Sequence, residues 1–379
     1  MPDSKCPFNT LPEFMRVTSL KPYDQPDSGF IVTLFEDTST IASSLHKAVG
    51  ELAEAFMLFH LLCNLQSKFP TNHDKMKALL TGGSGFIAAH CLETLLRHSH
   101  SVVTMDIREP GAFDEAIKSN PDFEGVIHCA SLFHFDIQDA KKDLLDPAIN
   151  DTVNIMRAIK AHAPSVRRVV VTSSAAMLNM KNHPDTYTEN HWNPISREEA
   201  APNPADGYRG SKIFAEKAAW KFVEDEKTNF TIASINPPLV FGPIAHYLNS
   251  LDRINTSNAR FRDMISGKLH EKLAPTGTFH WVDVHDVALA HVRALETESA
   301  AGHRFITSGS TFTNPEIADV IKTKFPELST KLPESWSSDL PEGLYDIDTS
   351  KARGVLNIEF SLLDQCVEST VKSVLKVQT

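Results

Sequence analysis

A tyrosine and a lysine four residues apart are the side chains of this sequence best suited to proton transfer. Tyr208 and Lys212 lie in YRGSKIFAEKAAW, and on a helix this spacing places both on one face. With a pKa of about 10 a tyrosine is a poor acid–base group at neutral pH, and a nearby ammonium lowers that pKa. We expect the pair to give a proton to a carbonyl oxygen while hydride reaches the carbon.

A serine at the end of a predicted strand could complete this chemistry. The segment RRVVVTSSAA is a run of apolar, β-branched residues that ends in hydroxyl side chains, the last of them Ser174. Open α/β sheets bind their ligands at the carboxyl ends of the strands. The Ser174 hydroxyl would bond the substrate oxygen and orient it against the tyrosine. Ser174, Tyr208 and Lys212 are therefore the predicted catalytic residues.

A glycine-rich turn, TGGSGFIA, predicts a nucleotide site upstream. Gly82 permits a tight turn, Gly85 lets the backbone approach a pyrophosphate, and Ala88 allows close packing of a helix on a strand. The free N–H groups at the start of that helix would bind the phosphates, so Phe86 and Ile87 join the predicted cofactor residues. The alternative is a glycine-rich turn without a ligand.

The elements around these motifs predict an α/β fold with a doubly wound parallel sheet. Short apolar runs alternate with helical segments from Met76 onward, and such runs are typical of strands buried on both faces. The expected strands are 77–81, 125–131, 167–174 and 230–238. The expected domains are an N-terminal extension (1–75, helical over 41–65), a Rossmann domain (76–240, with 281–310 returning to it) and a substrate lobe (241–280 and 311–379).

Composition and charge exclude several function classes. The chain has 379 residues, 41% of them hydrophobic, and a formal net charge of −11, which argues against a nucleic-acid partner. Five scattered cysteines suit reduced thiols in a cytoplasmic protein. The most apolar run, 55–65, is too short to span a membrane. His280, His285 and His291 do not share a helix face, and we predict no metal site.

From Met76 onward the sequence resembles the extended short-chain dehydrogenase/reductase superfamily. It is most similar to the branch of dihydroflavonol reductases, cinnamoyl-CoA reductases and fungal methylglyoxal (aldehyde) reductases. The matching stretches span nearly all of 76–310 and are TGGSGFIA, HCASLF, DLLDPAIN, RRVVVTSSAA, YRGSKIFAEKAAW, INPPLVFGP and WVDVHDVALAH. The resemblance implies a Rossmann domain with a small C-terminal lobe and NADPH-dependent reduction of a ketone or aldehyde, or the reverse reaction.

The resemblance also implies roles for individual residues. Ser174, Tyr208 and Lys212 correspond to the family's catalytic triad, with Lys212 also holding the nicotinamide ribose. Asn150 would support the site from a nearby helix, whereas His128 and Cys129 are interpreted as core residues. Further cofactor-binding residues implied by the resemblance are Ala130, Ser131 and Pro237, the last pressing on the nicotinamide.

The stretch HSVVTMDIREPGAFD leaves two interpretations of cofactor choice open. Asp106 lies about 20 residues past the glycine turn, where an acidic side chain would bind the ribose 2′-hydroxyl and select NAD. Under the family resemblance, Asp106 and Ile107 instead belong to the third strand. One strand–helix unit of roughly 30 residues, which carries the 2′-phosphate pocket, would then be absent. We favour the second interpretation, in which either an internal strand is missing or HSVVT fills its slot. Arg108 is then a candidate substitute ligand for the phosphate.

These observations predict a cytoplasmic enzyme that reduces a small-molecule ketone or aldehyde with NADPH, NAD being possible. One alternative is an NAD-dependent epimerase or hydroxysteroid dehydrogenase of the same superfamily. Another is a catalytically impaired, truncated reductase with a damaged cofactor pocket. The substrate, the oligomeric state and the role of residues 1–75 stay open at this point.

Overall fold

The structure is a computed structural model. It describes residues 15–19, 30–34, 75–106, 112–119, 121–130, 139, 141–175, 183–202 and 204–378, and all contacts given below are among these. The helix expected over 41–65 lies outside the described residues, as do Ile107, Arg108 and Ser131.

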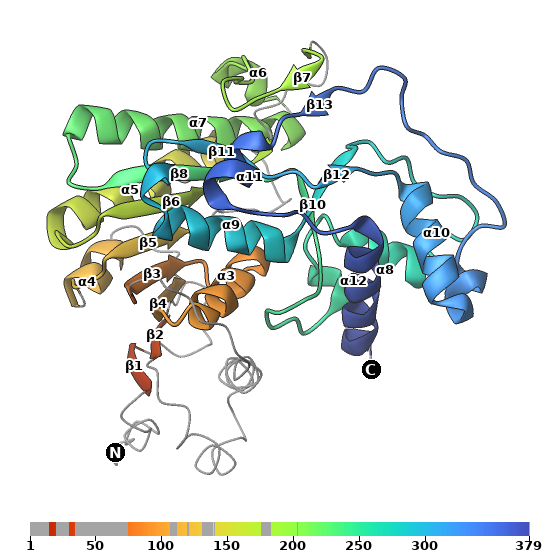
Figure 1. Ribbon diagram of the computed structural model, residues 1–379, viewed down its shortest axis with the longest axis horizontal. Coiled ribbons are helices and arrows are strands. Elements are labelled where there is room, and N and C mark those ends of the chain that lie inside the picture. Colours follow the sequence, from red (N-terminus) through yellow and green to blue (C-terminus); the bar gives the residue numbers. More distant parts are fainter. Residues whose placement is uncertain are drawn as a thin grey trace.

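An eight-stranded sheet forms the centre of the molecule, in the order β1-β2-β4-β3-β5-β6-β8-β11 (Figure 1). The six strands from β4 to β11 run parallel, and the fully described ones are almost entirely buried, which confirms the predicted doubly wound α/β fold. Their bounds are β3 (Lys77–Thr81), β4 (Ser101–Asp106), β5 (Gly125–His128), β6 (Arg168–Thr172), β8 (Thr231–Asn236) and β11 (Arg304–Ile306).

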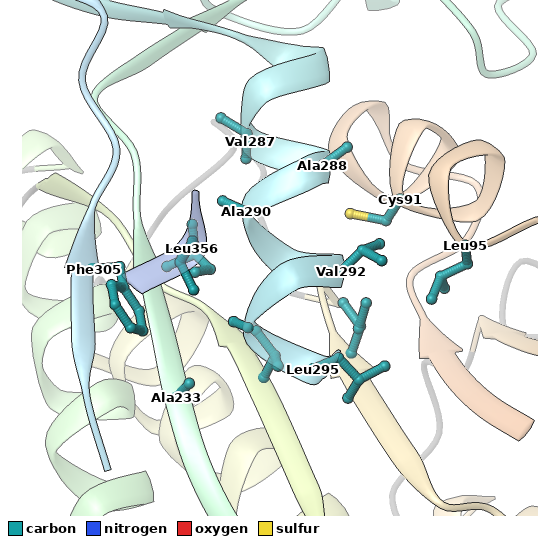
Figure 2. Packing of buried hydrophobic residues seen from close by; sticks show 14 of the residues in the cluster. Cys91, Leu95, Ala233, Val287, Ala288, Ala290, Val292, Leu295, Phe305 and Leu356 are labelled. Carbon is teal, nitrogen blue, oxygen red and sulfur yellow. The ribbon is translucent and has the colours of Figure 1, made fainter. Parts of the chain in front are cut away.

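Helices cover both faces of this sheet and bury two hydrophobic clusters against it. One face carries α4 (Ala112–Ser119), α5 (Asp146–His162) and α7 (Pro204–Glu226). The other carries α3 (Phe86–Arg97), α9 (Val284–Glu296) and α11 (Ser350–Leu356). In Figure 2, α9 lies with Ala288 and Val292 toward Cys91 and Leu95 of α3, and with Val287 and Ala290 on the side of Phe305 and Leu356. Helix α9 therefore packs on two sides at once.

The sheet beyond β3 differs from the usual order. Between α3 and β5 the described chain holds a single strand and a single helix, β4 and α4. A classical Rossmann sheet has two parallel strands on this side of its first strand. Here β4 pairs directly with β3, and next come two antiparallel strands, β2 (Phe30–Leu34) and β1 (Met15–Ser19). The segment HSVVT therefore fills the slot beside the first strand, in agreement with the expected absence of one strand–helix unit.

A second group of elements packs beside the sheet around a third hydrophobic cluster. Its helices are α8 (Ala259–Ile265), α10 (Asn314–Lys324) and α12 (Leu363–Gln378). A small sheet of β9 (Leu239–Phe241), β10 (His280–Asp283) and β12 (Ser310–Thr311) adjoins them. Within the predicted lobe 311–379, α11 instead packs on α9 in the Rossmann core, and the exact domain bounds stay a prediction.

Short elements complete the described chain. They are η2 (Lys141–Leu145), α6 (Arg197–Ala200), η4 (Leu251–Arg253), η5 (Glu298–Ala300), η6 (Pro326–Lys331) and the paired strands β7 (Thr186–Tyr187) and β13 (Asp346–Ile347). No helix among the described residues has the length and apolar character needed to cross a membrane.

Candidate active site

The glycine turn after β3 has the conformation that the sequence predicts. Gly82 has φ +74°, and a Cβ atom there would lie 2.8 Å from the backbone nitrogen of Ala130. The Gly82 N–H donates to the Met105 carbonyl at 2.8 Å, and the Gly85 N–H donates to the Gly82 carbonyl at 2.8 Å. Only glycine fits at position 82 without strain, because the turn packs against the chain that leaves β5.

The helix that follows this turn presents its amino-terminal end. Helix α3 begins at Phe86 after Gly85, which has no side chain to cap the first N–H groups, and the first turn holds no acidic residue. Ala88 is buried against the sheet, as predicted. Phe86 and Ile87 are half-buried at the first turn, where the positive end of the helix would meet a phosphate.

The three predicted catalytic residues come from two elements at the carboxyl edge of the sheet. Ser174 lies two residues beyond β6, and Tyr208 and Lys212 lie one turn apart on α7. The Ser174 side chain is hydrogen-bonded to the Tyr208 phenol. Two residues 34 positions apart in the chain therefore have their hydroxyl groups in contact, with the lysine on the adjacent turn.

Backbone hydrogen bonds hold the chain on both sides of Ser174 against the end of β8. The Ser173 N–H donates to the Ile235 carbonyl at 2.8 Å, and the Ala175 N–H donates to the Pro237 carbonyl at 2.8 Å. Pro237, which the resemblance assigns to the nicotinamide, is thus brought next to Ser174.

The electrostatics of the tyrosine differ from the expectation. Burial raises the pKa of Tyr208 above its ordinary value, and the hydrogen bond with Ser174 only partly opposes this. Burial also lowers the pKa of Lys212 to about 8. The predicted lowering of the Tyr208 pKa is therefore wrong for this structure, because the loss of solvent outweighs the hydrogen bond with Ser174. The phenol keeps its proton at neutral pH, the form that a proton donor needs.

A small cavity lies beside Lys212, between the ends of β5 and β6 and helices α5 and α7. Its volume is about 20 Å³, and its walls include Asp151, Ser173 and Glu216. Such a cavity has room for about one water molecule. The Asn150 side chain, expected to support the site, is exposed, and the neighbouring Asp151 lines the cavity instead. Burial raises the pKa of this Asp151 carboxyl.

The remaining predicted cofactor residues lie along the same edge of the sheet. Ala130 is half-buried, and its N–H donates to the Thr81 hydroxyl at 3.3 Å, next to the glycine turn. Asp106 is the last residue of β4, the strand directly beside β3. His128 is buried, its Nδ1 lies 2.8 Å from the same Thr81 hydroxyl, and burial lowers its pKa to about 4, consistent with a neutral core residue.

A buried cluster with two tyrosine rings, here called the aromatic wall, adjoins Ser174 through the next residue, Ala175. Ala175, Tyr187, Ile306 and Tyr345 form a buried cluster, and the rings of Tyr187 and Tyr345 meet edge to face at 5.0 Å. The parallel pairing of β7 with β13 holds this wall together, since the Asp348 N–H donates to the Tyr187 carbonyl at 2.8 Å. Residues near the C-terminus thereby become part of the site's surroundings.

The histidines considered as metal ligands have separate partners. His280 Nε2 lies 3.1 Å from the Tyr345 carbonyl and His285 Nδ1 lies 2.7 Å from Asp283. His291 Nε2 lies 2.7 Å from the Thr172 hydroxyl. These three side chains do not converge on one point.

A different group, His98, His100 and Glu296, has its ligand atoms within 4.8 Å of one another. The backbone N–H of Met76 donates to His100 Nδ1 at 3.1 Å, so the ring proton of neutral His100 is on Nε2. That Nε2 donates to Glu296 at 2.9 Å and offers no lone pair to a metal. The group is therefore better described as a hydrogen-bonded cluster than as a metal centre.

A glycine turn at a helix start, with serine, tyrosine and lysine at the same edge of a parallel sheet, defines a dinucleotide-dependent oxidoreductase. A model of the NAD dependent epimerase/dehydratase family matches residues 78–306, and the chain belongs to this family.

Named relatives lie in the reductase branch of the family. Ketoreductase azaE of Aspergillus niger is 44% identical, over 79% of this chain and 98% of the relative. The putative NADPH-dependent methylglyoxal reductase GRP2 of Candida albicans is 35% identical, over 78% of this chain and 97% of the relative. The crystal structure of Gre2 from Candida albicans in complex with NADPH has 32% identity and a TM-score of 0.73, covering 80% of this chain and 100% of that one.

These likenesses confirm the expected superfamily and its reductase branch, the assignment as an NAD(P)-dependent oxidoreductase, and the preference for NADP(H). The alignment with azaE runs over 331 residues, whereas 79% of this chain is about 299 residues. The difference of about 30 positions agrees with the absence of one strand–helix unit.

Proposed function

We propose that the chain reduces a ketone or aldehyde group of a small molecule to an alcohol with NADPH, Tyr208 being the proton donor. The observation that carries this proposal is the hydrogen bond between Ser174 and Tyr208, with Lys212 on the next turn of α7. Two adjacent hydroxyl groups can both donate to one carbonyl oxygen. The relatives named ketoreductase and methylglyoxal reductase support a small carbonyl compound as the substrate class.

Each of the three residues has a distinct task. Ser174 binds the substrate oxygen and fixes its direction. Tyr208, protonated at neutral pH, gives its proton to that oxygen. Lys212, whose pKa is about 8, is mostly positive at neutral pH and stabilises the phenolate that remains. Bound NADPH supplies the hydride to the carbonyl carbon.

The residues present fit such a dinucleotide. At Gly82 the positive φ and the contact with Ala130 leave no room for a side chain, as the tight turn of a dinucleotide-binding motif requires. Phe86 and Ile87 would offer their N–H groups to the phosphates, and Gly85, whose own N–H is bonded to the Gly82 carbonyl, has no side chain to block their approach. Ala130 and Ser131 would line the cofactor, and Pro237 would press on the nicotinamide.

The direct test is turnover by the purified chain, followed by the loss of reduced-nucleotide absorbance with a panel of aldehydes and ketones. We expect turnover with NADPH, slower turnover with NADH, and an alcohol as product. Tight NADPH binding would contradict the alternative of an impaired reductase with a damaged cofactor pocket. Interconversion of sugar nucleotides without net oxidation of the cofactor would support the epimerase alternative. No binding of either nucleotide would overturn the proposal.

A further inference from the structure

A buried carboxylate on α7 is the centre of a hydrogen-bond network that the proposed chemistry does not use directly. The Glu216 side chain is almost fully buried, with the residue 2% exposed. Its Oε2 accepts from the Ser173 hydroxyl at 2.6 Å and from the Asn236 amide at 2.8 Å. Its Oε1 accepts from the Ser234 hydroxyl at 2.7 Å and from Arg304 Nε at 2.8 Å. Both oxygens are thus occupied by donors from β8, from β11 and from the residue that follows β6.

Arg304 keeps this carboxylate charged. The pKa of Glu216 lies below its ordinary value although burial acts in the opposite direction, because the Arg304 guanidinium and the hydroxyl donors favour the ionised form. Arg304 itself lies over the Trp192 ring at 3.6 Å and donates to the His191 carbonyl at 3.1 Å. A buried ion pair is often no more stable than an apolar pair of the same size, so stability alone is a weak explanation for it.

The position of Glu216 suggests what the network does. Tyr208, Lys212 and Glu216 are four residues apart in succession, so they lie along one face of α7. Ser173 directly precedes Ser174, and Asn236 directly precedes Pro237. The carboxylate therefore joins the helix that carries the tyrosine and lysine to both strand ends that carry the other residues of the site.

We propose that Glu216 is a positioning residue that fixes Ser174 against Tyr208 by holding Ser173 and Asn236 to helix α7. The expected effect of Glu216 on turnover rests on the proposed function. Its expected effect on the Tyr208 pKa rests only on the Ser174–Tyr208 hydrogen bond and can be measured without a substrate. Arg304 acts through Glu216 by keeping it ionised. A misplacement of reacting groups by about 1 Å can cost roughly 100-fold in rate, so a small loosening here has a large effect.

The sharpest test compares Ser173→Ala with Ser234→Ala. Each variant removes one hydroxyl that donates a hydrogen bond to the Glu216 carboxylate, at 2.6 Å from Ser173 and at 2.7 Å from Ser234. Both serines are buried. Only Ser173 adjoins the predicted catalytic serine. We expect Ser173→Ala to lower kcat roughly 10- to 100-fold with little change in the NADPH dissociation constant, and Ser234→Ala to lower kcat far less, at a similar loss of thermal stability.

A substrate-free measurement separates this inference from the proposed function. The Tyr208 phenol is titrated by ultraviolet difference spectroscopy, with Tyr208→Phe versions of each variant as blanks. Because the Ser174 hydrogen bond lowers the Tyr208 pKa, its loss in Ser173→Ala and Glu216→Gln should raise that pKa, and Ser234→Ala should not. Glu224→Gln, the same change at an exposed position of α7, should leave kcat and the titration unchanged.

The outcomes are separable. If the wild type turns over no carbonyl but the Tyr208 pKa rises in Ser173→Ala and Glu216→Gln, the proposed function fails and the positioning role stands. If the two serine variants have equal kcat and equal Tyr208 titrations, Glu216 is a structural residue and the inference is wrong. Should Glu216→Gln fold poorly, Glu216→Gln combined with Arg304→Met removes both charges. Recovered thermal stability with full activity in this double variant would also overturn the inference.

Discussion

The two sides of the first sheet strand, β3, differ in how closely they follow the usual Rossmann arrangement. On one side, β5, β6, β8 and β11 follow in regular parallel order, and their ends carry the serine, the proline and the network around Glu216. On the other side a single parallel strand, β4, is followed by the antiparallel strands β2 and β1.

The residues proposed for catalysis and the residues that would select the cofactor therefore lie on opposite sides of β3. The side that would meet the nicotinamide and substrate has a dense set of hydrogen bonds around Ser174 and Tyr208. The side that would meet the adenosine ribose ends in Asp106, where relatives that use NADPH must accommodate a 2′-phosphate. Catalytic geometry can therefore be retained while the adenosine end of the site changes.

The largest expected effect is on the chemical side. Replacing Tyr208 by Phe removes the proton donor, so kcat/KM for carbonyl reduction should fall by roughly 10²- to 10⁴-fold while NADPH still binds. Steady-state kinetics and nucleotide fluorescence measure the two quantities. Tyr247→Phe, at an exposed tyrosine, is the matched control and should behave as wild type. Retained activity in Tyr208→Phe would assign the proton to another group.

A smaller effect is expected at the turn between the two sides. In Gly82→Ala the new Cβ would meet the Ala130 backbone at 2.8 Å, at a φ of +74° that alanine adopts only with strain. NADPH affinity should drop by about tenfold or more, and unfolding should become easier by about 1–3 kcal/mol. Gly354→Ala on α11, with nothing within 4 Å of its Cβ, should be neutral or stabilising. Equal behaviour of the two variants would contradict the tight fit at Gly82.

Because desolvation lowers the pKa of the half-buried Lys212, the stability of the protein should depend on pH. Its folded-state pKa is about 8, below the ordinary value of 10.5, so the folded protein binds the proton less readily than the unfolded chain. Holding the charged ammonium in the folded protein lowers the free energy of unfolding. This loss is fully present below about pH 8 and disappears as the pH rises toward 10.5. Without nucleotide, Lys212→Met should therefore raise Tm at pH 7, by about 2–4 °C for each kcal/mol gained in the free energy of unfolding. Near pH 10 the rise in Tm should be small.

Lys221→Met, at an exposed lysine of the same helix, should not raise Tm at either pH. A Tm for Lys212→Met that stays at or below the wild-type value at pH 7 would show that burial does not penalise the ammonium.

The smallest effect should come from the adenosine side. Asp106→Asn removes a negative charge at the end of β4, so the ratio of kcat/KM for NADPH to that for NADH should rise about three- to tenfold. An unchanged ratio would mean that the Asp106 carboxylate does not meet the ribose, as the family interpretation holds. Competition between the two nucleotides, measured by fluorescence, checks the same point without a substrate.

The strands of the parallel sheet could be predicted closely, because strands buried on both faces are continuous apolar runs. The expected strand at 77–81 coincides with β3, and RRVVVTSS contains β6. The small sheet around β10 and the pairing of β7 with β13 were not predicted. These strands have two to four residues, and their burial depends on distant segments rather than on local periodicity.

For the site, the sequence predicted which residues take part better than it predicted their pKa values. Ser174, Tyr208 and the glycine turn could be recognised from their spacing, but the direction of the Tyr208 pKa depends on burial, which the sequence does not specify. Glu216 was missed although a signal existed. It lies four residues after Lys212, between Ala215 and the buried Ala219, where a solvated carboxylate is unexpected.

The pairing of β7 with β13 has a consequence for biosynthesis. Ser174, Tyr208 and Lys212 leave the ribosome long before Tyr345 and Ile347, yet the aromatic wall beside the serine needs those late residues. A nascent chain therefore has Ser174, Tyr208 and Lys212 without the Tyr187–Tyr345 contact until translation is nearly finished. A message cut short before codon 345 would yield a chain that has these three residues but lacks Tyr345, β13 and α11, and with them part of the packing beside Ser174 and on α9.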